Sequence, residues 1–343
     1  MNPRCASIVA TTLLALALAG PSPAQDPPRD VEIRVAQVRD NIHVLYGQGG
    51  NIGVSIGEDG VFMIDDQFAP LTGKILEAVA TLTDKPVEFL VNTHWHLDHT
   101  GGNENFGKEG AVIVAHENVR TLMSAQQVME AFGQTVPPAP PEALPVITFT
   151  DSVTFHWNGD EVKVTHVPPA HTDGDSFVHF VNDNVIHAGD LYFNGMYPFI
   201  DAEHGGSIDG MIAGATRLLR LADEDTRIIP GHGEVSGVRE LRTYREMLRT
   251  VRDTIALQIR EGKTKEEIIA AKPTAQFDEA WGGGFLQPDQ WVGIVYDSIQ
   301  NTREEDAEGD ANQGEGRARS RQRNDGEAAD DDNPGDGGPR ASL

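Results

Sequence analysis

A dense group of titratable residues occupies one short segment of this chain. The segment Asn92–Asn103 reads Asn-Thr-His-Trp-His-Leu-Asp-His-Thr-Gly-Gly-Asn. In an extended chain, residues i, i+2 and i+4 face the same side, so we expect His94, His96 and Asp98 to converge on one pocket. A turn at the end of the preceding strand adds His99. Imidazole and carboxylate groups at this density indicate a metal site, with zinc as the first choice and iron or manganese as alternatives.

Three further residues follow predicted strands in glycine-rich contexts. His171 comes after the strand Val162–Val167, Asp190 follows His187-Ala188-Gly189, and His232 lies in Pro230-Gly231-His232-Gly233. A single histidine or aspartate after a strand is more often a cap or a satisfied polar group. The order of the three residues after the first cluster makes them candidate metal ligands as well.

Taken together, these residues resemble the signature of the metallo-β-lactamase superfamily. The signature is His-x-His-x-Asp-His, then His, then Asp, then His, and it is matched in order by His94, His96, Asp98, His99, His171, Asp190 and His232. An earlier aspartate at the end of a strand matches Asp65, with its neighbour Asp66 as the competing assignment. The resemblance covers roughly residues 35–260. It implies a four-layer αββα sandwich of two mixed sheets, with metals in a groove at one edge.

The resemblance also implies how the ligands share two zinc ions. One ion takes His94, His96 and His171, and the other takes Asp98, His99 and His232. Asp190 bridges the two ions, and Asp65 orients ligands or the catalytic loop. Two zinc ions that share a water lower its pKa from 15.7 towards about 7, which produces a hydroxide able to attack a carbonyl carbon. Asp98, beside that water, orients it or carries a proton and is the expected catalytic residue.

These assignments predict a metal-dependent hydrolase that cleaves an acyl bond of a small molecule: an ester, thioester, lactone, amide or β-lactam. In the β-lactamase subclass with a cysteine ligand, a substrate-binding lysine follows three positions later. Here Asp190 stands in place of the cysteine and Phe193 in place of the lysine. The missing lysine weighs against a β-lactam substrate, but the predicted export of the chain keeps a β-lactam-degrading enzyme as an alternative. Another is an iron-dependent oxidoreductase of the same fold, although diiron relatives place glutamate where this chain has His96 and carry a flavin domain that is absent here.

The elements around these motifs alternate between strands and helices. Short β-rich runs separated by turn residues predict antiparallel strands at Ile42–Tyr46, Ile52–Ile56 and Val61–Ile64. Helical spacing over Pro70–Leu82 before the apolar run Val87–Val91 predicts a β-α-β unit. Further strands are predicted at 111–115, 147–149, 153–155, 162–167, 176–180 and 185–187, and helices at 119–132, 209–221, 238–259, 264–271 and 288–300. Two β-rich halves accompanied by helices indicate an α/β fold with helices outside face-to-face sheets.

Two other groups of polar residues receive expectations. His116, at the end of a predicted strand, is expected to be structural. The loop after Asp190 contains Tyr192, Asn194, Tyr197 and His204. Substrate contacts or an oxyanion donor are expected in such a loop.

The ends of the chain differ from its centre. Arg4, the apolar stretch Ile8–Ala19 and small residues up to Ala24 predict a secretory signal peptide over residues 1–24, and hence a periplasmic or secreted protein. The catalytic domain is expected over 25–302, and a disordered acidic tail over 303–343. Cleavage after Ala24 would remove Cys5, the only cysteine, so the mature chain is expected to have no disulfide and no cysteine ligand. It would also remove the apolar stretch, so no integral membrane segment is expected to remain.

Charge restricts the partners. The chain of 343 residues has 27 Lys and Arg against 53 Asp and Glu, a formal net charge of −26. Such a surface repels phosphate backbones, so we expect a small-molecule substrate and no nucleic acid. Nothing in the sequence indicates the oligomeric state.

Overall fold

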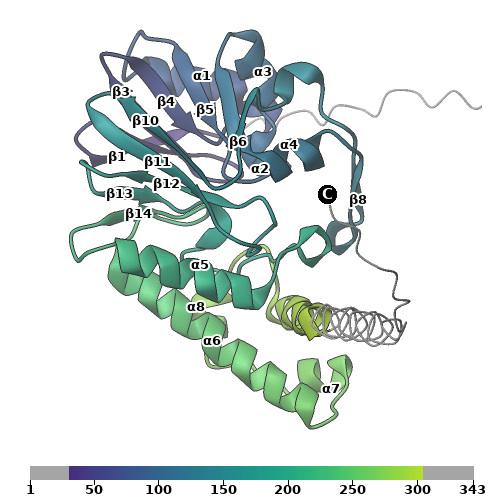
Figure 1. Cartoon of the computed structure of the whole chain (residues 1–343). Helices are drawn as coiled ribbons and strands as arrows, with labels where there is room; N and C mark the ends of the chain where they lie inside the picture. Colours follow the sequence, from purple (N-terminus) through teal and green to yellow (C-terminus); the bar gives the residue numbers. More distant parts are fainter. Residues whose placement is uncertain (1–30, 304–343) are drawn as a thin grey trace, which may run out of the picture.

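The computed structural model describes residues 31–303, which form two β-sheets packed face to face with helices on both outer faces (Figure 1). The first sheet has seven strands in the order β1 (Arg34–Arg39), β2 (Ile42–Tyr46), β3 (Ile52–Gly57), β4 (Gly60–Ile64), β5 (Val87–Val91), β6 (Val112–His116) and β9 (Ile147–Phe149). Strands β1 to β4 pair antiparallel, whereas β4, β5, β6 and β9 pair parallel.

The second sheet has five strands in the order β10 (Ser152–Trp157), β11 (Asp160–His166), β12 (Ser176–Phe180), β13 (Val185–His187) and β14 (Arg227–Ile229). Only β13 and β14 pair parallel. The two sheets share a buried core, in which Phe62 of β4 meets Phe155 and Phe180 at ring-centroid distances of 5.0 and 6.3 Å. The mixed sheets of the predicted sandwich are thus confirmed.

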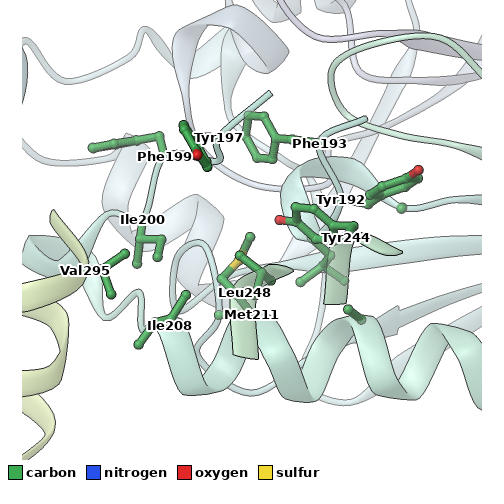
Figure 2. Packing of buried hydrophobic residues seen from close by; sticks show 14 of the residues in the cluster. Tyr192, Phe193, Tyr197, Phe199, Ile200, Ile208, Met211, Tyr244, Leu248 and Val295 are labelled. Carbon is green, nitrogen blue, oxygen red and sulfur yellow. The ribbon is translucent and has the colours of Figure 1, made fainter. Parts of the chain in front are cut away.

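Successive side chains of a strand point to opposite faces of the sheet, so one face of each sheet packs against the other sheet and the opposite face packs against helices. Met63 packs with α1 (Thr72–Ala80) and α3 (Asn103–Lys108), while its neighbours Phe62 and Ile64 face the second sheet. Beneath the second sheet lie α5 (Ile208–Leu221) and α6 (Val238–Arg260). Their apolar faces meet in a core that includes Met211 and Leu248 (Figure 2). Four layers result, as predicted.

Three short helices and one long helix complete the C-terminal half and the site edge. They are α2 (Leu97–Thr100), α7 (Lys265–Ala270), α8 (Asp278–Trp281) and a helix over residues 288–303. A capping box of Thr264 and Glu267 is present at the start of α7. In the part of the chain that is described, no helix combines the length and apolar character required to cross a membrane.

The predicted helix over 119–132 is wrong in its second half. Helix α4 (Glu117–Met123) ends early, and the chain then forms a hairpin of β7 (Gln127–Met129) and β8 (Gln134–Val136). Gly133, at φ 60°, supplies the left-handed turn that a helix does not tolerate. The edge strand β1 and the hairpin strands were not predicted. The predicted signal peptide and all of the tail beyond residue 303 lie outside the described residues.

Candidate metal centre

The candidate ligands all follow strand ends at one edge of the sandwich. After β5 the chain bends over residues 93–95 and then turns into α2, so Asp98 and His99 lie in a helical turn. The expectation that Asp98 continues the extended side of His94 and His96 is therefore wrong. From the second sheet, His171 follows β11. Asp190 follows β13 and His232 follows β14, and these two strands pair in parallel.

His94, His96 and His171 form a first triad, in which one ring nitrogen from each lies within 4.8 Å of the others. The second nitrogen of each ring has its own acceptor. His171 Nδ1 donates to the carbonyl oxygen of Phe199 at 2.8 Å, and His94 Nδ1 lies 3.0 Å from the hydroxyl of Thr93. A neutral imidazole has only one N–H, so these bonds direct an unprotonated nitrogen of each ring into the pocket.

The donor set of this triad fits a metal ion. His96 Nδ1 and His171 Nε2 face each other at 2.8 Å, and the buried His94 Nε2 has no hydrogen-bond partner. Three converging lone pairs in a buried site are costly unless a cation accepts them. Imidazole nitrogens are preferred ligands of Zn²⁺, and also of iron.

Asp98, His99 and His232 form a second triad within the same 4.8 Å limit. His232 Nε2 lies 3.3 Å from Asp98 Oδ2 and 3.4 Å from His99 Nε2. The three side chains thus surround one point, and mixed nitrogen and oxygen ligands suit a divalent cation there.

Asp190 lies between the triads. Its carboxylate oxygens are 3.1 Å from His99 Nε2, 3.4 Å from His171 Nε2 and 3.5 Å from His232 Nε2. The backbone of Gly231 makes this position possible, because a Cβ atom there would overlap Asp190 Oδ1. Oδ1 faces His99 of the second triad and Oδ2 lies near ring nitrogens of both triads, so this carboxylate is placed to reach a cation in either one.

Electrostatics divide the histidines into two groups. Burial lowers the pKa of His171 to about 4, and burial together with the neighbouring His99 lowers the pKa of His94 well below its usual range, so both rings are neutral. Burial opposes protonation of His232 as well, but the charges of Asp190 and Asp98 raise its pKa to about 9. The second triad therefore attracts positive charge strongly, as a cation site requires.

Asp65 rather than Asp66 supports a candidate ligand. Asp65 Oδ2 accepts hydrogen bonds of 2.8 Å from His99 Nδ1 and from the Thr93 hydroxyl, which leaves His99 Nε2 facing the triad. Asp66 instead accepts from the backbone N–H of Gly102. Burial raises the pKa of Asp66 well above its usual range. The geometry thus favours the predicted role for Asp65.

Asp201 is not among the predicted site residues, yet it contacts two members of the first triad, His96 and His171. Its Oδ2 accepts from His96 Nε2 at 2.8 Å, and its backbone N–H donates to the carbonyl of His171. His204 Nδ1 donates to the same carboxylate at 2.8 Å. The only sequence signal for Asp201 is its position in the loop after Asp190, from which the sequence predicts substrate contacts instead.

We expect Asp201→Asn to weaken metal binding about 10- to 100-fold, since the partner of a ligating histidine fixes its tautomer and basicity. Affinity is measured by competition with a chromogenic chelator, independently of activity. Glu203→Gln, an exposed acidic residue of the same short helix, is the matched control. Equal affinities for the two variants would show that Asp201 serves packing alone.

The four residues of the loop after Asp190 from which substrate contacts were expected are engaged in contacts within the protein instead. Tyr192 is buried beside Tyr244 (Figure 2). The Tyr192 hydroxyl is hydrogen-bonded to Ser236, and the Tyr197 hydroxyl donates to Asp278. Asn194 donates to a backbone carbonyl, and His204 is held by Asp201. A local pattern does not indicate side-chain direction, which long-range packing decides here.

His116 is structural, as expected. Its ring stacks on His166 with centroids 3.7 Å apart, and Nε2 lies 2.9 Å from the carbonyl of Thr150. It caps α4 rather than entering the metal pocket.

A pocket of about 460 Å³ opens over the two triads. Its polar lining is His96, Asp98, Gln134, His171, Asp190 and His232. Among the described residues that line it there is no lysine or arginine. Phe193, which stands where the β-lactamase subclass with a cysteine ligand has a substrate-binding lysine, is fully buried and stacks on His232 at 5.0 Å.

The family model of the metallo-beta-lactamase superfamily matches residues 45–232, more than half of the chain. The chain belongs to this superfamily, whose members are mostly metal-dependent hydrolases. Among curated proteins it is 25% identical over 187 residues to the 2,4-dinitroanisole O-demethylase subunit alpha of Nocardioides sp., covering 51% of this chain and 50% of that protein. It is 24% identical over 170 residues to the acyl-coenzyme A thioesterase MBLAC2 of Gallus gallus, covering 44% and 58%. The chain thus spans about half the length of the first relative and 58% of the second.

Solved structures show the same fold. The DIM-1 metallo-beta-lactamase superposes with a TM-score of 0.53 at 19% identity, covering 64% of this chain and 99% of that structure. The sec-alkylsulfatase Pisa1 from Pseudomonas sp. gives a TM-score of 0.56 at 18% identity, with 77% of this chain and 50% of that structure covered. The predicted family and fold are confirmed.

Proposed function

We propose that this protein is a metal-dependent hydrolase of an acyl bond in a small, neutral substrate. The observation that carries the proposal is the meeting of two ligand triads at Asp190, on the floor of a pocket lined by neither lysine nor arginine. The thioesterase named among its relatives supports acyl chemistry. The presence of His96 in the first triad favours a hydrolase over the iron-dependent oxidoreductase alternative.

The residues divide the work of hydrolysis. His94, His96 and His171 would hold one divalent metal, and Asp98, His99 and His232 a second, with Asp190 reaching both. Such ions, most simply Zn²⁺, lower the pKa of a water and polarise a carbonyl oxygen when bound. Burial opposes ionisation of Asp98, but His99 and His232 lower the pKa of its carboxyl, so it is ionised at neutral pH. Because Asp98 also lines the pocket, it can orient a water and accept a proton at its carboxylate.

A β-lactam is the less suitable substrate. Penicillins and cephalosporins carry a carboxylate, which a lysine or arginine anchors at about 1.5–3 kcal/mol as a charged hydrogen bond. This pocket offers carboxylates and phenyl rings in place of such an anchor. The buried Phe193 packs against the imidazole of the candidate ligand His232 and offers no positive charge to a substrate.

We expect kcat/KM for a neutral activated ester or lactone to exceed that for a penicillin by about 10-fold or more, the loss of one such anchor. Both are measured at one pH with zinc supplied. Chelation is expected to abolish both activities, and zinc, iron or manganese added back separately identifies the preferred metal. Chelator-resistant hydrolysis would refute the metal mechanism. Penicillin turnover at about 10⁶ M⁻¹s⁻¹ would favour the antibiotic-degrading alternative.

Export is part of this proposal. The apolar stretch before Ala24 supports cleavage at that position, which would leave a periplasmic or secreted enzyme without a thiol. Expression of the full chain with its N-terminal segment, followed by intact mass measurement of the secreted or periplasmic fraction, tests for a mature chain that begins at Gln25.

A further inference from the structure

The mouth of the metal pocket gathers large apolar side chains that the fold leaves in water. Leu97, Phe132 and Phe285 are 43%, 41% and 51% exposed. All three line the pocket, together with Phe68, Met129 and Phe199. Single exposed apolar residues are ordinary, but a cluster beside a polar site marks a surface that a ligand covers.

The aromatic residues form two walls, one beside each triad. Phe132, from the turn of the β7–β8 hairpin, contacts Phe199 at 4.9 Å, and Phe199 lies 5.8 Å from the ring of His96. On the other side, Phe285 lies 6.2 Å from the ring of His232 and 6.5 Å from Phe193. An apolar group in contact with either wall is therefore adjacent to a candidate ligand.

The chemistry of the walls restricts the occupant. The rings bear no charge, and the lining contains no cation that would hold a phosphate, sulfate or carboxylate. Apart from the candidate metal ligands, the lining contains no charged side chain, and the net charge of the chain is −26, which disfavours the approach of anions. The volume of about 460 Å³ is that of a small-molecule site rather than of a folded partner.

We propose that the Phe132 wall and the Phe285 wall form a subsite for an uncharged alkyl or aryl group of the substrate, so that the enzyme selects apolar esters, thioesters or lactones. This inference rests on the proposed function. The β7–β8 hairpin stands where the second half of a helix was predicted, and its apolar residues Met129 and Phe132 line the pocket.

The test is a series of p-nitrophenyl esters with acyl chains of two to eight carbons. Burial of each methylene is expected to raise kcat/KM about fourfold until the pocket is filled. Phe132→Ala or Phe285→Ala is expected to reduce this dependence to less than about twofold per methylene, with each rate expressed relative to the acetate ester in the same variant. Val128→Ala and Leu257→Ala remove exposed apolar side chains outside the pocket and are the matched controls.

A binding measurement separates this inference from the proposed function. Octanamide, an uncharged amide, is titrated by calorimetry into the zinc-loaded parent and its variants, and weaker binding to either phenylalanine variant supports the subsite even if no ester is hydrolysed. Ester hydrolysis that is independent of chain length in the parent, with no binding of octanamide, would overturn the subsite and leave the hydrolase intact. A change of oligomeric state in Phe132→Ala with an unchanged chain-length dependence would instead assign the patch to a second copy of the chain.

Discussion

Asp190→Ala is expected to lose kcat/KM by about 10³-fold or more and to retain less than about half of the parental zinc. Its carboxylate is the one group within 3.1–3.5 Å of ring nitrogens from both triads among the described residues, so its removal affects both candidate sites at once. Several kcal/mol of charge stabilisation in the transition state corresponds to this loss of rate. Zinc is measured by inductively coupled plasma mass spectrometry on the same samples that are assayed.

The control for this variant is Asp253→Ala, which removes an exposed carboxylate on α6. We expect it to keep both activity and zinc. Circular dichroism establishes that each variant is folded. A folded Asp190→Ala protein with parental zinc content and with kcat/KM reduced less than about threefold would exclude the bridging role, whatever metal is bound.

Phe62→Ala is expected to lower the free energy of unfolding by about 3–5 kcal/mol, the usual cost of a large cavity in a core. Phe62 is fully buried between the sheets and contacts Phe155, Phe180 and Phe89, the last at 6.1 Å. Denaturant unfolding is measured with excess chelator in every sample, because a bound metal would add its own stabilisation.

Phe285→Ala is the matched comparison, since it removes the same side chain from a half-exposed position. Its unfolding free energy is expected to change by about 1 kcal/mol or less. Similar losses for the two variants would contradict the assignment of the main core to the space between the sheets.

Local pattern accounts for most of the sandwich. A strand over Val61–Ile64 places the side chains of Phe62 and Ile64 on one face of the sheet and that of Met63 on the other, and the structure shows this arrangement. Helix α6 begins at the predicted residue and ends one residue later, because its apolar spacing and flanking residues are themselves local signals. The helix predicted over 119–132 ends at Met123 instead, and Met129 and Phe132 of the hairpin that follows line the pocket.

The sequence by itself determined the types of the candidate ligands and the family, because imidazole and carboxylate groups at fixed spacing carry their chemistry with them. The family resemblance already implied how the ligands group into two triads. Only the tertiary structure decided that Asp98 lies in a helical turn and that Asp201 meets His96 across 105 residues. It also turned Tyr192 and Tyr197 into the core and left Phe132 and Phe285 at the pocket. Partners and side-chain directions of this kind depend on contacts between distant segments, which no local period encodes.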